Sequence, residues 1–472
     1  MVLINKINYL TRRRKVFSHL LVVDTKGASR LVFRGLIFGQ KMKLPPMEWI
    51  EKAIRINSTT YNTNEELVRF LGPLLSDCGL KVEEQKVTEN GVTFKNLIAF
   101  SHTVDSPDLL ALNTHLDTVD PGDFEQWTKT EKDPFRATRV RDRIYGLGSA
   151  DVKLDFLCKI WACRLARPWK RPFVLVGTYG EERGLIGVQQ LFKAKKIKPK
   201  YALVGEPSNL ELIYAHKGHL IFTVSVPLKT EAKNSPSIEK KWKGISAHSS
   251  TPEIGDNALI KGLTDIFKRG YGIVQLHAGT NFNKIPDSCE AILVSGQNQT
   301  TKMVFQLIQF LEELKREFKA RKDPRFSPAF TCLSLNMART TKDSLEFTFD
   351  IRTLPDVNQE RLEKRVREDI SAFGAKVVEV TSDASLKGQK NSRFLVQATK
   401  ALKQCGVKPV LKTKATSTEA AIYQSNGASA IVFGPGISVG NAHRPNEYNS
   451  LKQMELATKF YTQLLKTPVG ET

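Results

Sequence analysis

The segment FVLVGTYGEE, residues 173–182, carries the pattern that decides the fold, an apolar run that ends in two acidic residues. The same pattern recurs in LLALNTHLD, residues 109–117, and in YALVGE, residues 201–206. Short apolar runs of this kind are typical of buried strands. Because ligands bind at the carboxyl ends of strands in open α/β sheets, we expect the polar residues that end these three strands to meet in one pocket.

Two further polar residues follow apolar segments in the same way. Asp151 comes after IYGLGSA, and His443 lies a short loop beyond ASAIVFGPG. With His115, Glu182 and Glu206 they make five candidate metal ligands. Histidine with carboxylates, and without a thiolate partner, suits a hydrolytic zinc site. The sequence therefore predicts a catalytic metal centre.

The residues next to these ligands suggest supporting roles. Alternation along a strand puts Asp117 on the same side as His115, where its carboxylate can accept the hydrogen bond of the ring nitrogen that the metal does not use. Glu181 and Glu182 repel each other, which favours a site where one acid ligates a dication and the other transfers a proton. Solvated acidic pairs are also common. Asp151 follows a glycine turn and opens a helix, so it is either a cap or a bridge between metals.

Size and composition are those of a globular enzyme. The chain has 472 residues, of which 41% are hydrophobic and 25% charged, enough for two or three domains. It has no apolar stretch of 18 residues, so we expect no membrane span. The cysteines show no paired spacing, which indicates reduced core residues of a cytoplasmic protein. They are Cys78, Cys158, Cys163, Cys289, Cys332 and Cys405.

A net charge of +22 raises the question of a nucleic-acid partner. Residues 1–41 hold nine Lys or Arg against Asp24 alone, so this segment carries +8 and leaves +14 for the rest. Elsewhere the basic residues are scattered through expected helices, which is typical of a solvated surface. We expect no nucleic-acid partner, and a milder attraction of anionic substrates.

The expected organisation has four parts. Residues 1–41 are a basic N-terminal extension, expected to be poorly ordered. From 42 to 213, strands and helices alternate, which predicts a mixed, mainly parallel sheet with helices on both faces. From 214 to 390, strands alternate apolar and polar residues, which predicts a smaller antiparallel α+β domain. Residues 391–472 return to the first pattern, so the smaller domain is inserted into an α/β catalytic domain.

Local signals within these parts predict two helix caps and one polar segment. Asn64 and Asp256 each stand before a segment with helical apolar spacing, and we expect each to cap its helix. The run PLKTEAKNSPSIEKKWKG, residues 227–244, indicates a polar hairpin or a loop insertion.

At this point the motifs match a known family. The chain resembles the co-catalytic zinc amidohydrolases and exopeptidases, which include acetylornithine deacetylase, succinyl-diaminopimelate desuccinylase, aminoacylase and glutamate carboxypeptidase. The resemblance covers roughly residues 45–466. It is strongest to acetylornithine-deacetylase-like members, through AHKGHLIFTV and AHSSTPEIGDNA. The motifs that carry it are, in order, HLDTVDPGD, GLGSADVK, EERGLIG, GEPS, GISAHSSTPEIGDNA and GNAHRPNEY.

The resemblance implies two divalent metal ions, with zinc expected and cobalt or manganese also compatible. His115, Asp151 and Glu206 would hold one ion. Asp151, Glu182 and His443 would hold the other, with Asp151 as the bridge. Glu181 would be the general acid and base.

The same resemblance assigns roles around the substrate. The inserted domain would be a lid and the platform of a homodimer. His248 would stabilise the oxyanion. Arg352 would bind the substrate α-carboxylate, and Asn283 would contact the substrate. Gly434 and Gly436 would line the pocket.

Three positions depart from the family pattern. Leu154-Asp155 stand where two glycines are common, and Gly180 stands where an Asp is common. The loop Thr416-Ser417-Thr418-Glu419 differs from the usual Ser/Thr-Asp. None of these removes a ligand, but each bears on the shape of the pocket.

The function expected from sequence is hydrolysis of the amide bond of N-acyl amino acids by a metal-activated water, in a cytoplasmic enzyme of the arginine-synthesis type. The substrate would be a small N-acyl amino acid or a small peptide, with no membrane partner. One alternative is a dipeptidase or carboxypeptidase that uses the same metals. Another is a basic binding protein that kept the fold and lost catalysis.

Overall fold

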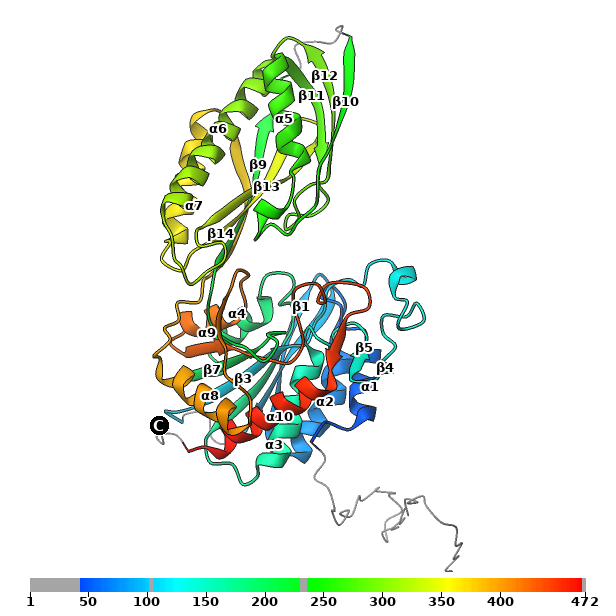
Figure 1. Cartoon of the computed structure of the whole chain (residues 1–472), viewed down its shortest axis with the longest axis vertical. Coiled ribbons are helices and arrows are strands. Elements are labelled where there is room, and N and C mark those ends of the chain that lie inside the picture. Colours follow the sequence, from blue (N-terminus) through cyan, green and yellow to red (C-terminus); the bar gives the residue numbers. More distant parts are fainter. Residues whose placement is uncertain (1–42, 102–105, 230–235, 469–472) are drawn as a thin grey trace, which may run out of the picture. The chain divides into compact units, whose positions relative to one another are not determined.

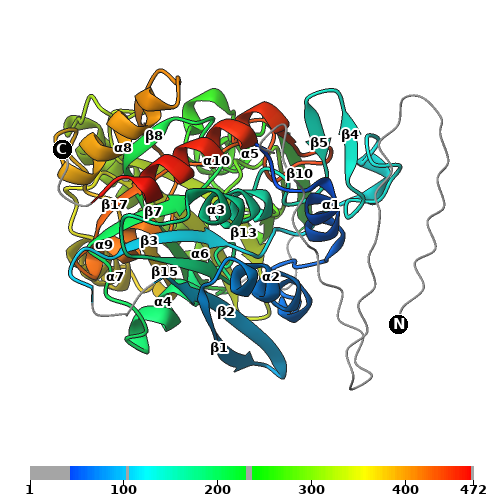
Figure 2. The ribbon, with the colours of Figure 1, turned by 90° about the horizontal axis from the view of Figure 1, so that it is seen from below.

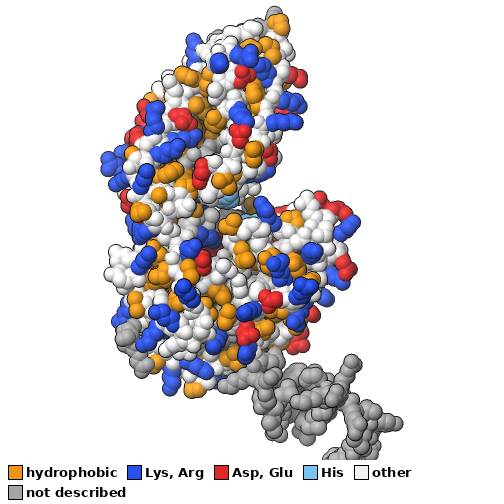
Figure 3. Space-filling view, in the orientation of Figure 1, with side chains coloured by type: hydrophobic (Ala, Val, Ile, Leu, Met, Phe, Trp, Pro, Cys, Tyr) orange, Lys and Arg blue, Asp and Glu red, His pale blue; other side chains and the backbone are white. Residues whose placement is uncertain are grey.

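The computed structural model describes residues 43–101, 106–229 and 236–468 (Figure 1). The N-terminal extension expected at residues 1–41 lies outside the described residues. None of the helices in the described part of the chain combines the length and apolar character that a bilayer crossing requires. Basic side chains are scattered over the face drawn in Figure 3, among acidic and uncharged ones.

An eight-stranded mixed sheet with helices on both faces forms the first part of the fold, in the order β1-β2-β6-β3-β7-β17-β8-β16. The strands are β1 (Lys81–Glu89), β2 (Val92–Phe100), β3 (Leu110–His115), β6 (Phe173–Thr178), β7 (Tyr201–Gly205), β8 (Leu212–His216), β16 (Leu411–Lys414) and β17 (Ser429–Val432). A small sheet beside it comprises β4 (Thr138–Val140), β5 (Arg143–Tyr145) and β18 (Tyr448–Ser450).

The central strands β3, β6 and β7 run parallel and are buried along their whole length. Such strands are continuous apolar runs because both faces are covered. Figure 2 shows α3 and α10 side by side along the sheet. The helices of this part are α1 (Met47–Arg55), α2 (Glu65–Asp77), α3 (Lys153–Ala166), α4 (Ile186–Lys193), α8 (Arg393–Gln404), α9 (Ala420–Ser425) and α10 (Leu451–Lys466), with a 3-10 turn, η1 (Phe124–Gln126).

A seven-stranded antiparallel sheet forms the second part, in the order β10-β12-β11-β13-β14-β9-β15. Its strands are β9 (Gly218–Pro227), β10 (Ser237–Lys243), β11 (Tyr271–Ala278), β12 (Ser288–Ser295), β13 (Cys332–Thr340), β14 (Ser344–Thr353) and β15 (Lys376–Asp383). Its helices are α5 (Ala258–Arg269), α6 (Gln299–Ala320) and α7 (Gln359–Ala372), with a 3-10 turn, η2 (Pro252–Ile254). Apolar residues of these helices and of one sheet face share a core. The fold class expected from sequence is confirmed.

Three local expectations are corrected. Asn64 precedes α2 but caps nothing, because its carboxamide pairs with both backbone groups of Lys95. The cap of α5 is Asn257, whose side chain accepts from Ile260 N. The segment read as a polar hairpin or loop contains β10, which pairs with β12 along its whole length.

A buried ion pair joins α3 to the central strands. Asp155 and Lys159 are fully buried, and their side chains lie 2.7 Å apart. Lys159 also donates to Asn113 O and Thr114 Oγ1 of β3, at 2.6 and 2.7 Å. A Cβ on Gly205 of β7 would lie 2.0 Å from Asp155 Oδ2, so the strand needs glycine at that point. The pair thus fixes α3 against the two strands that precede His115 and Glu206.

Replacing Lys159 by Met should lower the free energy of unfolding by about 3–5 kcal/mol, because it leaves the Asp155 carboxylate buried without its partner. Urea unfolding followed by tryptophan fluorescence measures the change. The matched control is Lys241→Met, which breaks the exposed pair with Glu290 and should change the free energy of unfolding far less, because water and salt screen that pair. Equal effects of the two substitutions would contradict this role of the buried pair.

Candidate metal centre

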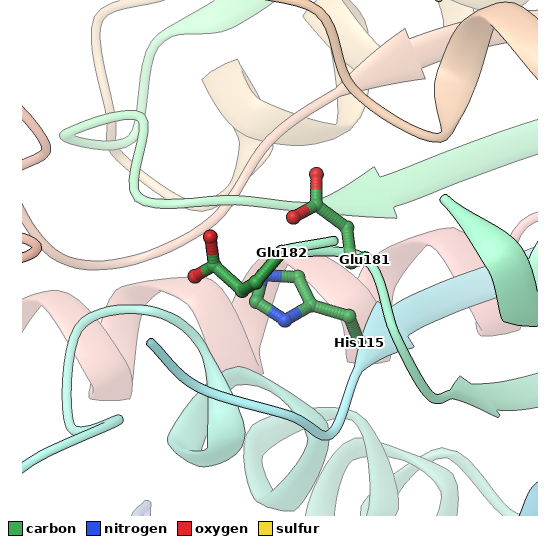
Figure 4. Close-up of side chains that lie close together, drawn as sticks. All are labelled: His115, Glu181 and Glu182. Atoms are coloured by element: carbon green, nitrogen blue, oxygen red, sulfur yellow. The ribbon is translucent and has the colours of Figure 1, made fainter. Parts of the chain in front are cut away.

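The site is built at the carboxyl ends of the central parallel strands. His115 is the last residue of β3, and its ring is buried. The turn after β6 carries Glu181 and Glu182, and Glu206 follows β7 directly. Figure 4 shows the two glutamates close to the His115 imidazole.

Asp151 lies between two imidazoles. Its Oδ1 is 3.1 Å from Nε2 of His115, and its Oδ2 is 3.2 Å from Nε2 of His443. Helix α3 begins only at Lys153, and its N-cap is Val152. Asp151 therefore does not cap the helix, and its two carboxylate oxygens face the two imidazoles.

Two groups of side chains have ligand atoms within 4.8 Å of one another. One is His115, Glu181 and Glu182, and the other is Asp151, Glu182 and His443. Nε2 of His443 lies 3.0 Å from Glu182 Oε1. Four of the five predicted ligands thus come together.

Glu206, the fifth predicted ligand, is buried but belongs to neither group. Its Oε2 accepts a hydrogen bond from Lys414 Nζ at 3.0 Å, and its Oε1 is buried without a hydrogen-bond partner among the described residues. Lys414 ends β16 and was not anticipated from sequence. An orphaned carboxylate oxygen beside His115 and Asp151, which both act on the pKa of Glu206, fits a missing cation.

The acids of the site change each other's proton affinity. Burial raises the pKa of Glu181 well above its usual range, and the carboxylates of Glu206 and Glu182 raise it further, against the effect of His115. A carboxyl group with a raised pKa can hold and release a proton near neutral pH. The negative charge of Glu182 raises the pKa of His443 to about 12, and the hydrogen bonds of His443 to Asp151 and Glu182 act in the same direction.

Asp117 has a different main contact from the one expected. Its carboxylate accepts from the backbone N–H groups of Glu181 and Glu182, at 3.1 and 3.2 Å. The Nδ1 atom of His115 lies 3.0 Å from the backbone carbonyl oxygen of Asp117 and 3.6 Å from its Oδ1. Asp117 therefore fixes the turn that carries the acidic pair, and its carbonyl group as well as its carboxylate faces the imidazole.

Two buried glutamates to which the sequence analysis gave no role support the site. Glu447 accepts from the backbone N–H groups of Ala150 and Asp151, at 2.7 and 3.0 Å, so it fixes the turn that presents the bridging carboxylate. Glu419 accepts from Asn113 Nδ2 and from Thr178 Oγ1. Burial raises the pKa of both glutamates to about 7. The sequence could have pointed to Glu447, because it lies in the same motif as His443, GNAHRPNEY.

The positions that depart from the family pattern now have physical reasons. Asp155 belongs to the buried pair with Lys159, and its carboxylate accepts a hydrogen bond from Thr114 of β3. Gly180 has φ 66°, a left-handed conformation that favours glycine. The longer side chain of Glu419 reaches the two central strands. None of the three removes a candidate ligand.

Residues predicted to contact substrate lie in two places. Gly434 and Gly436 follow β17, where a Cβ on Gly434 would lie 2.5 Å from Glu206 O. In the inserted domain, Ser249 N donates to Asn283 O, so Asn283 adjoins the loop of His248. Burial, with the nearby charge of Arg352, lowers the pKa of His248 to about 4.

Arg352 is buried in a network on the inserted domain. Its Nε and Nη2 donate to the Asp350 carboxylate at 3.0 and 2.9 Å. Asp350 also contacts Nε2 of His219 at 2.9 Å and accepts from Ser249 Oγ at 2.8 Å. Asp350 thereby links the arginine to the loop that carries His248.

Comparison with known proteins fits this geometry. The model of Peptidase family M20/M25/M40 matches residues 111–467. Acetylornithine deacetylases from Klebsiella pneumoniae and Salmonella typhimurium are 30% and 31% identical, over 53% of this chain and 67% of each relative. An aminoacylhistidine dipeptidase from Vibrio alginolyticus has a TM-score of 0.63 at 15% identity, over 91% of this chain and 98% of that one. An M20 family metallo-carboxypeptidase from Sulfolobus solfataricus has a TM-score of 0.60 at 16% identity, over 89% and 98%.

The fold and the site define a hydrolase that acts on linear amide bonds. The chain belongs to Peptidase family M20/M25/M40.

Zinc binding should release protons and should tighten as pH rises, because the metal-free chain keeps His443 protonated at pH 7 and a ligand imidazole must be neutral. Calorimetry in buffers of different ionisation enthalpy counts the protons. His443→Gln should lower the count by about one, whereas His277→Gln, at an exposed histidine of β11, should leave it unchanged. Affinity that does not change between about pH 6 and 8 would contradict the assignment of His443.

The raised pKa of His443 also has a consequence for the metal-free chain. It stabilises the folded state at pH values below the unfolded pKa of about 6.5, and this contribution is lost as pH rises toward the folded value.

Proposed function

We propose that this chain hydrolyses the amide bond of N-acyl amino acids in the manner of an acetylornithine deacetylase, as a step of arginine synthesis. The observation that carries the proposal is the Asp151 carboxylate between His115 and His443, with Glu181 beside them. The similarity to acetylornithine deacetylases supports the choice of substrate class.

The donor set suits two divalent cations, which we propose to be zinc. His115, Asp151 and Glu206 would hold one, and Asp151, Glu182 and His443 the other, with Asp151 shared. Cobalt or manganese would fit the same oxygen and nitrogen donors. When bound, such ions polarise the scissile carbonyl group and lower the pKa of water, so that a nucleophile is available at neutral pH.

Glu181 is the residue that moves protons in this proposal. It accepts a proton from the attacking water and passes it to the nitrogen of the departing amine. Its burial among other carboxylates suits this task, because the raised pKa lets it hold the proton between the two transfers. The buried carboxylate of Asp117 keeps the turn of Glu181 in place.

The inserted domain supplies the remaining groups. His248 stabilises the developing oxyanion. Arg352 binds the α-carboxylate of the amino acid, since the pair with Asp350 leaves N–H donors of the guanidinium available. Asn283 contacts the substrate from the adjoining loop, and Gly434 and Gly436 line the pocket floor.

N-acetylornithine and other N-acetyl amino acids should be turned over at least tenfold faster, by kcat/KM, than dipeptides with the same carboxyl-terminal residue. Release of the free amine, followed with an amine-reactive dye, measures both classes. Dipeptides as the better substrates would contradict the deacetylase proposal and favour a dipeptidase or carboxypeptidase.

The matched variant in the same assay is Glu181→Gln. Loss of the proton carrier should lower kcat by about 10²–10⁴-fold or more. Metal analysis should find the same zinc content as in the parent chain, because Glu181 is not one of the proposed ligands. The control Glu313→Gln, at an exposed glutamate of α6, should keep full activity. Retained turnover in Glu181→Gln would refute the assigned base.

We further propose a cytoplasmic homodimer that associates through the inserted domain. All six cysteines are buried and unpaired, as in proteins of reducing compartments. Ile245 and Ile254, near the His248 loop, are 63% and 72% exposed, and a second subunit that covered them would remove this apolar surface from water.

Light scattering should give twice the mass of the chain, and Ile254→Lys should shift the equilibrium toward the monomer. Ile437→Lys, at a partly exposed isoleucine after β17, is the control that should leave the mass unchanged. A monomeric parent chain would contradict the proposal.

A further inference from the structure

A second polar cavity lies away from the metal centre. It has a volume of about 170 Å³ and is lined by residues of α8, of α10 and its end, and by Arg171, which precedes β6. This is far more space than one water needs and less than a drug-sized ligand occupies. The polar residues that line it include Arg171, Gln397, Lys400, Gln404, Gln463 and Lys466.

The charge of this cavity is entirely of one sign. It has three cationic side chains, those of Arg171, Lys400 and Lys466, and no acidic residue lines it in the described part of the chain. The lysines are partly or fully exposed, so water can solvate them. Arg171 cannot be solvated in this way.

Arg171 is a buried cation without an anion. The residue is 3% exposed, and its Nε and Nη2 atoms are buried without a hydrogen-bond partner among the described residues. The carboxylate that acts on the pKa of Arg171, that of Asp108, is paired with Lys200 at 2.7 Å. The guanidinium carbon lies 5.6 Å from the centre of the Tyr201 ring, a contact that offsets only part of the desolvation cost.

The charge of Arg171 persists at neutral pH. Burial lowers the pKa of Arg171 only to about 10. A buried guanidinium that stays charged is costly unless a carboxylate or phosphate pairs with it, and its planar set of donors matches the oxygens of such groups.

Gln397 is a second buried group in the same cavity that lacks a partner. The residue is 7% exposed, and its Oε1 is buried and makes no hydrogen bond with any described residue. A carboxamide can present either an acceptor or two donors. A ligand that carries both charged oxygens and a hydroxyl, such as hydrogen phosphate, would pair with Arg171 through the former and with Gln397 through the latter.

The cavity is separate from the metal centre. Arg171 stands two residues before the first residue of β6, whereas Glu181 and Glu182 follow the last one. The two sites therefore lie at opposite ends of the same strand. An anion in the cavity would not touch the candidate ligands.

We propose that this cavity is a binding site for a small oxyanion of phosphate size, bound by Arg171 with Gln397, Lys400 and Lys466. The oxyanion is a free phosphate-like anion, whose charged oxygens pair with Arg171 and whose hydroxyl donates to Gln397 Oε1.

The test uses the full chain with metal bound and inorganic phosphate as the probe, titrated against chloride at constant ionic strength. Phosphate should raise the thermal unfolding midpoint of the parent chain by about 2–4 °C at saturation. Arg171→Met should raise the dissociation constant for phosphate at least tenfold and should abolish the rise in the unfolding midpoint that comes from this cavity. Any phosphate response that survives in Arg171→Met belongs to other sites, including the metal centre.

The variants separate ligand binding from a merely structural role of Arg171. Without phosphate, Arg171→Met should unfold at the same temperature as the parent chain or higher, because it removes an unpaired buried charge. Lys400→Met should weaken binding about threefold to tenfold. Lys403→Met, one turn further along α8 and absent from the cavity lining, should leave it unchanged.

The proposal is overturned if phosphate shifts the unfolding midpoints of the parent chain and of Arg171→Met equally.

Discussion

Concentrated negative charge is the constraint on which the rest of this structure depends. Neighbouring parallel strands end in acids, and the turn before α3 adds the carboxylate of Asp151 to them. Without a cation these groups repel one another, most strongly where they are buried, as Asp151 and Glu206 are. The chain compensates with the positive charges it has, the imidazolium of His443 between Asp151 and Glu182 and the ammonium of Lys414 on Glu206.

The stabilisation of these acids extends to the backbone. Asp117 accepts hydrogen bonds from two backbone N–H groups of the turn that carries Glu181 and Glu182. Glu447 accepts hydrogen bonds from two backbone N–H groups of the turn that carries Asp151. In both cases a carboxylate fixes the main chain, and the main chain then aims another carboxylate. This accounts for a site that contains many acids and still has a defined geometry, because the turns themselves are held by charge-assisted hydrogen bonds.

Sequence reasoning was most successful where periodicity and position carry the information. Buried parallel strands are continuous apolar runs, so the ends of β3, β6 and β7 could be found by inspection and their polar residues assigned to one pocket. It was least successful for partners that only the tertiary fold brings close. Lys414 is some two hundred residues from Glu206 in sequence, and nothing local distinguishes it from other lysines. The Asp155–Lys159 pair did leave a signal, since two opposite charges four residues apart stand in a helix whose other residues are largely apolar.

The contact between Lys414 and Glu206 shows how the metal-free chain and a metal-loaded one can share a fold. Only Oε2 of Glu206 is engaged, while Oε1 is buried and unpaired. If Glu206 is a ligand, as we propose, a cation on the side of Oε1 would leave the hydrogen bond of Lys414 to the other oxygen in place. His443, in contrast, would have to lose its proton before its Nε2 could act as a ligand. The two residues would thus change their compensating charge differently, since Glu206 would gain a cation and His443 would exchange a proton for one.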